Sequence, residues 1–260
     1  MANYWQDREA AAFAKITNRS ITETEKLLAK SYSKTSRKIV EEFADTYEKL
    51  FKTIADGREP TPADLYKLDK YWKMSVSVNN ELRKLGIYQE QILSKKFVDE
   101  FAEIYGAISF NDIKAFSTID REGMVKAINS IWCADGKTWS TRIWDNISYL
   151  QETLQEELIH CVSTGKKTTD LKNILQERFN VSYSQADMLV RTEMAHIQNS
   201  AAQQRYKDYG IEEVQVWADK DERRCEVCGK LHQKKFPINA ALPIPAHPRC
   251  RCSIIPVVED

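Results

Sequence analysis

Apolar residues recur at helical spacing along most of the first 210 positions. Between Asn3 and about Ala55 the sequence contains neither Gly nor Pro, and apolar side chains return every three or four residues. We therefore expect one or two long amphipathic helices. Thr61 and Pro62 suit the N-cap and first residue of a following helix. That helix is predicted to end at Gly86, and another to span about residues 88–105.

The second half begins with a less regular stretch. Residues 106–139 contain three glycines and predict short helices and loops. Apolar positions from Ile143 to Cys161 then step by three and four, which predicts a helix. A short helix over about 170–179 should precede a last helix that opens at Ser182 with a capping box and closes at Gly210. The predicted domains are 1–135, helical and partner-binding, and 136–260.

After Gly210 the period changes to that of strands. Residues 214–217, 235–238 and 251–257 are short apolar or alternating runs, and they predict a small antiparallel sheet. The predicted fold class is therefore mainly α, with long N-terminal helices and a small α+β module at the C-terminus.

Composition narrows the class of protein. Lys plus Arg and Asp plus Glu both total 38, so the net charge is zero and does not mark a nucleic-acid-binding protein. The N-terminus lacks the apolar run of a signal peptide, and no stretch of 18 apolar residues predicts a membrane anchor. We expect synthesis in a reducing cytoplasm, where cysteines bind metals more often than they form disulfides.

Four of the six cysteines cluster near the C-terminus and predict a metal site. Cys225 and Cys228 form a CxxC knuckle, and a His-Pro-Arg-Cys-Arg-Cys segment follows. Tetrahedral zinc needs four ligands from these five candidates, and a closed set would be structural. The predicted ligands are Cys225, Cys228, His247 and Cys250, with Cys252 as the alternative fourth ligand. The competing interpretations are reduced core thiols or a disulfide.

The same segment is locally basic. Between Lys220 and Arg251 there are eight basic and three acidic residues. Such a surface could hold DNA phosphates without reading sequence, although a solvated rim around a metal site would look the same. The candidate DNA-binding residues are Arg223, Arg224, Lys230, Lys234, Lys235, Arg249 and Arg251.

Glu193 occupies an apolar helical stripe with Val190 and Ile197 and should therefore be buried. A buried carboxylate needs a partner. Arg191 lies on another face of the helix, so we expect donors from the C-terminal module instead, either backbone groups or an arginine such as Arg223 or Arg251. The role predicted for Glu193 is structural, not that of a general base.

The order of these residues resembles the phage Mu F-like minor head proteins, also called phage head morphogenesis proteins. The resemblance covers about residues 150–256 and rests mainly on Arg191-Thr192-Glu193 and on the closing His247-Pro-Arg-Cys250-Arg-Cys252, with Trp217 between them. One position departs from the pattern, because Gln233 stands where the family often has a Gly.

The resemblance implies a non-enzymatic minor capsid protein, inside the phage head near the portal, that aids head assembly, genome packaging or DNA ejection. Implied partners are the portal protein, major capsid or scaffold proteins, and non-specific double-stranded DNA. Arg191, Glu193 and Trp217 would be structural, and zinc the probable structural cofactor.

Three other classes of protein compete with a head protein. One is a generic DNA-binding or adaptor protein outside any virion, against which the balanced charge argues. The others are an enzyme and an effector. A zinc-knuckle nuclease could use His232 and Asp221, whereas the HxE motif of zinc deaminases is missing. Because the sequence ends at Asp260, soon after the motif, we expect no toxin domain behind it.

Overall fold

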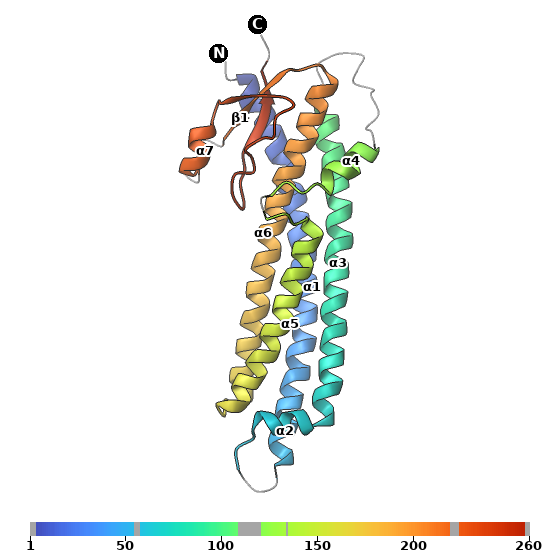
Figure 1. Cartoon of the computed structure of the whole chain (residues 1–260), viewed down its shortest axis with the longest axis vertical. Coiled ribbons are helices and arrows are strands. Elements are labelled where there is room, and N and C mark those ends of the chain that lie inside the picture. Colours follow the sequence, from blue (N-terminus) through green and yellow to red (C-terminus); the bar gives the residue numbers. More distant parts are fainter. Residues whose placement is uncertain (1–3, 55–57, 109–120, 134, 219–223, 258–260) are drawn as a thin grey trace. The chain divides into compact units, whose positions relative to one another are not determined.

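The computed structural model describes residues 4–54, 58–108, 121–133, 135–218 and 224–257 (Figure 1). It is mainly helical, with a small sheet near the C-terminus, as the sequence predicts. The helices are α1 Tyr4–Thr53, α2 Pro62–Lys67, α3 Asp69–Ala107, α4 Arg121–Ile128, α5 Trp139–Ser163, α6 Thr168–Asp208 and α7 Glu226–Leu231. The strands are β1 Glu213–Trp217, β2 Lys235–Pro237 and β3 Ser253–Pro256.

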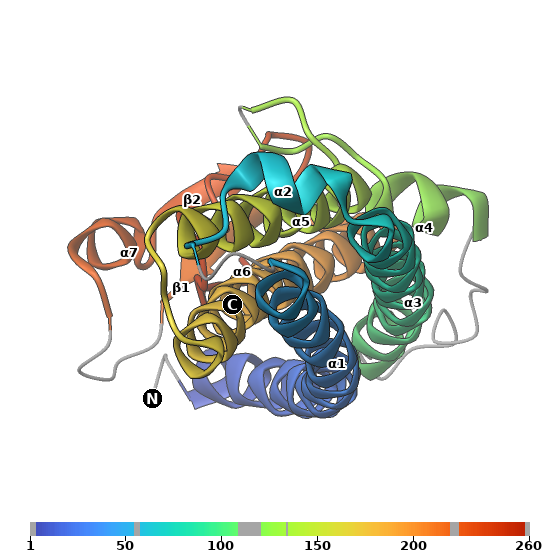
Figure 2. The same ribbon diagram turned by 90° about the horizontal axis from the view of Figure 1, so that it is seen from below.

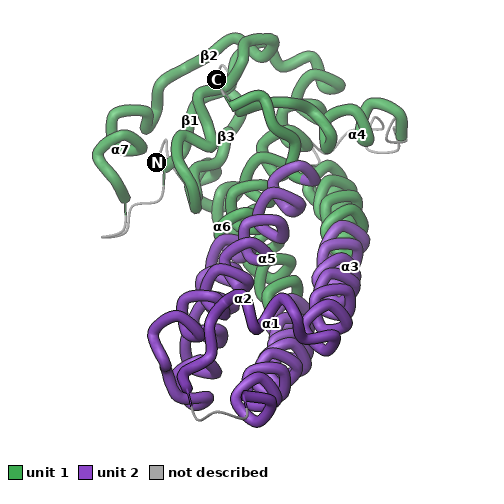
Figure 3. The backbone as a smooth tube through the Cα atoms, turned by 60° about the horizontal axis from the view of Figure 1, so that its bottom comes forward, with its two compact units in different colours: residues 1–25, 92–139, 188–260 green, residues 26–91, 140–187 purple. Residues whose placement is uncertain are grey.

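The chain forms two compact units (Figure 3). Unit 1 contains residues 1–25, 92–139 and 188–260, and unit 2 contains residues 26–91 and 140–187. Both units are therefore discontinuous in sequence, and α1, α3 and α6 each contribute to both. The division into 1–135 and 136–260 remains a prediction about domains.

Unit 2 is a helical bundle built from parts of α1, α3, α5 and α6, with α2 at its corner (Figure 2). Its apolar stripes meet in a core that includes Leu28, Phe43 and Leu154, each fully buried. Polar contacts also join neighbouring helices. The Tyr47 hydroxyl of α1 donates to the Cys161 carbonyl of α5 at 3.0 Å. Hydrophobic burial along these stripes is the main favourable contribution to the stability of such a bundle.

Two predicted helix boundaries are wrong, and both errors lie in unit 2. Helix α3 continues through Gly86, because that glycine allows close helix packing: a Cβ there would lie 2.7 Å from Cζ3 of Trp144. Helix α6 continues through Ser182, which is buried and caps nothing. Its hydroxyl lies 3.2 Å from the Tyr32 hydroxyl and donates to Asn146 Oδ1, also at 3.2 Å.

Unit 1 contains the sheet, which has the strand order β2-β1-β3 and is antiparallel throughout. Val214 lies opposite Phe236 on one side and Pro256 on the other. All four residues of β3 are buried. The short strands thus form a platform whose loops carry the predicted metal ligands.

None of the helices in the described part of the chain is both long and apolar enough to cross a membrane.

Candidate metal centre

The first half of the site is built at the start of α7. Cys225 is the N-cap residue of this helix, and its sulfur accepts a hydrogen bond from the backbone N–H of Cys228 at 3.3 Å. This is the geometry that the CxxC spacing predicts. The same hydrogen bond lowers the pKa of Cys225, because it stabilises the thiolate. The Cys225 sulfur is thus prepared to bind a cation.

The second half is a turn from His247 to Cys250, in which the Cys250 N–H donates to the His247 carbonyl at 3.2 Å. His247 Nδ1 lies 2.8 Å from the Pro248 carbonyl. A carbonyl oxygen only accepts, so Nδ1 carries the proton. The lone pair of Nε2 then faces Cys225 and Cys228, whose sulfurs lie 3.2 and 3.1 Å away. A backbone carbonyl fixes metal-binding histidines in this way.

Cys250 and Cys252 complete the cluster from the other side. The Cys228 and Cys250 sulfurs are 3.8 Å apart. A hydrogen bond from the Cys252 thiol lowers the pKa of Cys250 to about 5, and the same pairing raises the pKa of Cys252. Burial raises the pKa of Cys228 to about 12. Without a metal, Cys250 is therefore the thiolate of this pair.

The donor types suit a soft metal ion, and in the described residues they form two overlapping groups of three that share Cys228. Cys225, Cys228 and His247 form one group whose ligand atoms lie within 4.8 Å of one another, and Cys228, Cys250 and Cys252 form a second. Zn–S bonds of about 2.3 Å at tetrahedral angles place two sulfurs about 3.8 Å apart, which matches the Cys228–Cys250 separation. The folded chain thus brings all five predicted candidates together around Cys228.

Helix α6 holds the second half of the site through side chains for which the sequence predicted no such contact. Thr192 Oγ1 accepts the Arg249 N–H at 3.0 Å. Asn199 donates to the Cys252 carbonyl at 3.0 Å and accepts the Ile254 N–H at 2.9 Å. Asn199 is a polar residue at a buried helical position, and Thr192 belongs to the Arg191-Thr192-Glu193 motif.

The residues with predicted structural roles all lie in unit 1. Glu193 is 2% exposed, as predicted, and accepts a hydrogen bond from Trp132 Nε1 at 3.0 Å. The donors expected from the C-terminal module remain a prediction. Arg191 forms an ion pair with Glu25. Trp217 is buried, and its ring N–H donates to Asp7 at 3.1 Å.

The candidate DNA-binding residues surround the site on the surface. Lys230 forms an exposed ion pair with Glu226. Arg223 lies outside the described residues. The others are exposed and are Arg224, Lys230, Lys234, Lys235, Arg249 and Arg251.

His232, the residue on which a nuclease would depend, has contacts that fix its ring. Its Nδ1 accepts the Ala218 N–H at 3.2 Å, and the ring packs edge-on against Trp217. Asp221, its proposed companion, lies outside the described residues. These contacts give His232 a packing role in the sheet.

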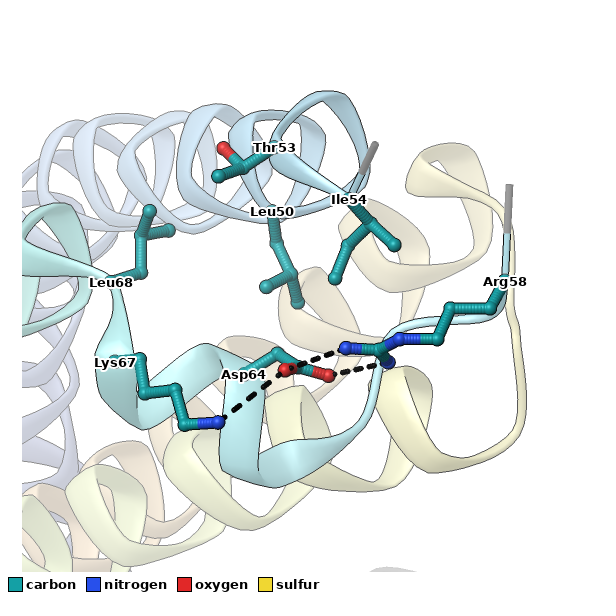
Figure 4. A pocket seen from close by; sticks show the side chains of 7 residues that line it. All are labelled: Leu50, Thr53, Ile54, Arg58, Asp64, Lys67 and Leu68. Carbon is teal, nitrogen blue, oxygen red and sulfur yellow. Dashed lines mark hydrogen bonds and ion pairs between the residues drawn. The ribbon is translucent and has the colours of Figure 1, made fainter. Parts of the chain in front are cut away.

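A separate cavity of about 350 Å³ lies in unit 2 and contains none of the predicted site residues (Figure 4). Arg58 donates to both carboxylate oxygens of Asp64, at 2.8 and 2.9 Å, and these contacts lower the pKa of Asp64. Lys67 also points toward Asp64, while Leu50 and Leu68 form the apolar side. The charged side chains in this cavity are thus occupied with one another.

Comparison with known proteins agrees with the site. Residues 152–255 match the family model described as phage Mu protein F like protein, which confirms the resemblance. The matched range includes all of α6, nearly all of the sheet and all five candidate ligands. No curated protein and no solved structure matches the chain.

Proposed function

We propose that this protein, whose residues 152–255 match the family model of phage Mu protein F like proteins, is a non-enzymatic minor head protein of a tailed phage. It is present in few copies inside the head near the portal, and it aids head assembly, genome packaging or DNA ejection. The observation that carries the proposal is that the matched region folds around one Cys/His cluster. The long helices of the protein would provide the surface that binds the portal or other head proteins.

The cluster holds a structural zinc ion in this proposal. Cys225, Cys228, His247 and Cys250 are the ligands, and Cys252 donates a hydrogen bond to Cys250. Four protein ligands leave no position for a reactive water, so the ion stabilises the fold and performs no chemistry. The exposed cations around the site would contact DNA phosphates.

The metal assignment is tested by measuring zinc in the purified chain and recording thermal unfolding with and without a strong chelator. One zinc ion per chain is expected, and its removal should unfold the tail while most helical signal persists, because metal binding supplies folding free energy. Cys228→Ser should lose zinc, whereas Cys161→Ser, buried in unit 2, should retain it. An unchanged transition in chelator with no bound metal would contradict the assignment.

The role is tested by quantitative immunoblotting of purified heads and DNA-free procapsids against the portal protein. A few copies in both particles are expected for a protein recruited before packaging. Absence from both particles would remove the head-protein role.

A further inference from the structure

One stretch of α1 carries charge of a single sign. Residues 26–40 contain five basic residues and no Asp or Glu, although the whole chain is neutral. All of this stretch belongs to unit 2. All five are exposed, and Lys38 pairs with Glu81; the other four define what we call the α1 basic stripe: Lys26, Lys30, Lys34 and Arg37.

The stripe occupies one face of the helix. Its members are four, four and three residues apart, so at 100° per residue they fall within an arc of about 80°. With a rise of 1.5 Å per residue, the row is about 17 Å long. The opposite face is buried in unit 2 through Leu28, Tyr32 and Ile39. The helix therefore holds four cations in a row on a backbone that cannot rotate away.

Nearby carboxylates do not neutralise the stripe. In the described residues none of its four members has an ion pair. The next acidic residue along α1, Glu41, pairs with Lys172 of α6 at 2.9 Å. On α3, Glu81 is shared by Lys38 and Lys84, at 2.9 and 2.7 Å, which leaves a further positive charge beside the row.

The side chains of α6 that form hydrogen bonds with this stretch, Gln176 and Ser182, are neutral. Gln176 accepts a hydrogen bond from the Ser36 hydroxyl at 3.3 Å. One turn later, Asn180 accepts a hydrogen bond from Gln176. With Lys172 one turn earlier, this row of α6 offers amides and a cation. The ligand that complements the surface is a polyanion.

We propose that the α1 basic stripe binds the backbone phosphates of double-stranded DNA without reading sequence, as a second DNA contact separate from the tail. A membrane surface fits less well, since interfacial helices present a broad apolar face beside their cations, and here that face is buried. Leu27 is the large apolar side chain exposed within the stretch. The choice of DNA among polyanions rests on the proposed place of the protein inside a phage head.

The size of the effect follows from counterion release. Each neutralised phosphate contributes about 0.9 to the slope of log K against log salt, so four contacts contribute about 3.6. Between 50 and 200 mM salt, the stripe should therefore account for a loss of affinity on the order of 10²-fold.

The experiment uses the full chain and a labelled 24-base-pair duplex of random sequence, with Kd measured from 50 to 300 mM NaCl. The stripe variant replaces all four cations with Gln, which retains helix propensity. A control variant carries Lys49→Gln, Lys52→Gln, Lys70→Gln and Lys73→Gln, which change the net charge equally elsewhere in unit 2. Circular dichroism should confirm that both variants remain folded.

The expected result is a slope reduced by about 3.6 in the stripe variant and by far less in the control. Equal losses in both variants would overturn the proposal, because net charge alone would then explain binding. Unchanged DNA binding would also overturn it, and stripe-dependent binding to phosphatidylserine vesicles in that case would assign the surface to a membrane.

This outcome is separable from the proposed function. If the chain binds DNA through the stripe but is absent from phage heads, the proposed head role is wrong and the proposed DNA-binding site is retained. If the chain is present in heads but binds DNA equally well without the stripe, the proposed site is wrong and the head role is retained.

Discussion

Asn199 is one of the side chains through which α6 holds the last strand and the second half of the Cys/His cluster. It is 2% exposed, and its amide serves both the Cys252 carbonyl and the Ile254 N–H. Asn199→Ala would leave both backbone groups buried without this partner. Each buried unsatisfied group costs about 1–3 kcal/mol, and the higher helix propensity of Ala returns about 0.5 kcal/mol. We therefore expect a loss of about 2–5 kcal/mol in the free energy of unfolding of the tail.

The assay is urea unfolding followed by tryptophan fluorescence, to which Trp217, buried in β1, contributes the signal of the tail. It is combined with competition for zinc by a chelator. Asn180→Ala is the matched control, since Asn180 lies on the same helix but is exposed. It should be neutral or slightly stabilising, and zinc affinity should fall only in Asn199→Ala. A loss below about 1 kcal/mol in Asn199→Ala, or equal effects in both variants, would refute the reasoning, because orphaned buried groups always cost more than an exposed amide.

Four further outcomes follow from particular contacts. Gln233 has a φ of 63°, a left-handed conformation that favours glycine, so Gln233→Gly should raise the melting temperature by an amount worth about 1 kcal/mol. Burial raises the pKa of Glu9 from 4.5 to about 7. The free energy of unfolding should therefore fall by about 3 kcal/mol as pH rises from below 4.5 to above 7. Unfolding measured across this pH range should show the fall in wild type and not in Glu9→Gln. Gly86→Ala should destabilise unit 2 by about 1–3 kcal/mol in thermal unfolding, whereas Gly106→Ala, with no atom within 4 Å, should be neutral or stabilising. Glu193→Ala should lower the melting temperature of the tail, and unchanged melting would contradict its structural role.

Local patterns predicted a helix or strand correctly wherever one hydrophobic period, helical or alternating, ran through the whole element. The run from Ile143 to Cys161 became α5, and the three strands lie where alternation placed them. The errors at Gly86 and Ser182 share one cause. Both residues read locally as helix boundaries, but each is kept inside a helix by a neighbour distant in sequence, Trp144 for Gly86 and Tyr32 for Ser182.

The candidate ligands could be predicted because their chemistry depends on spacing within two short segments. The contacts that hold them could not. Thr192 and Asn199 reach backbone groups more than fifty residues away, and no local pattern specifies such a pairing. The basic stretch of α1 was visible in the sequence, yet its exposure and lack of ion partners depend on how unit 2 packs.

The position of the Cys/His cluster also orders the maturation of the chain in time. Both halves of the cluster follow α6 in the sequence, so the cluster can close only after Cys250 and Cys252 have left the ribosome. Until then Gln198 and Asn199 of α6, which are buried in the finished protein, lack their partners Ser253 and Cys252. With the proposed zinc ion in this cluster, a shortage of zinc would leave chains that have complete helices and an open, aggregation-prone C-terminal end.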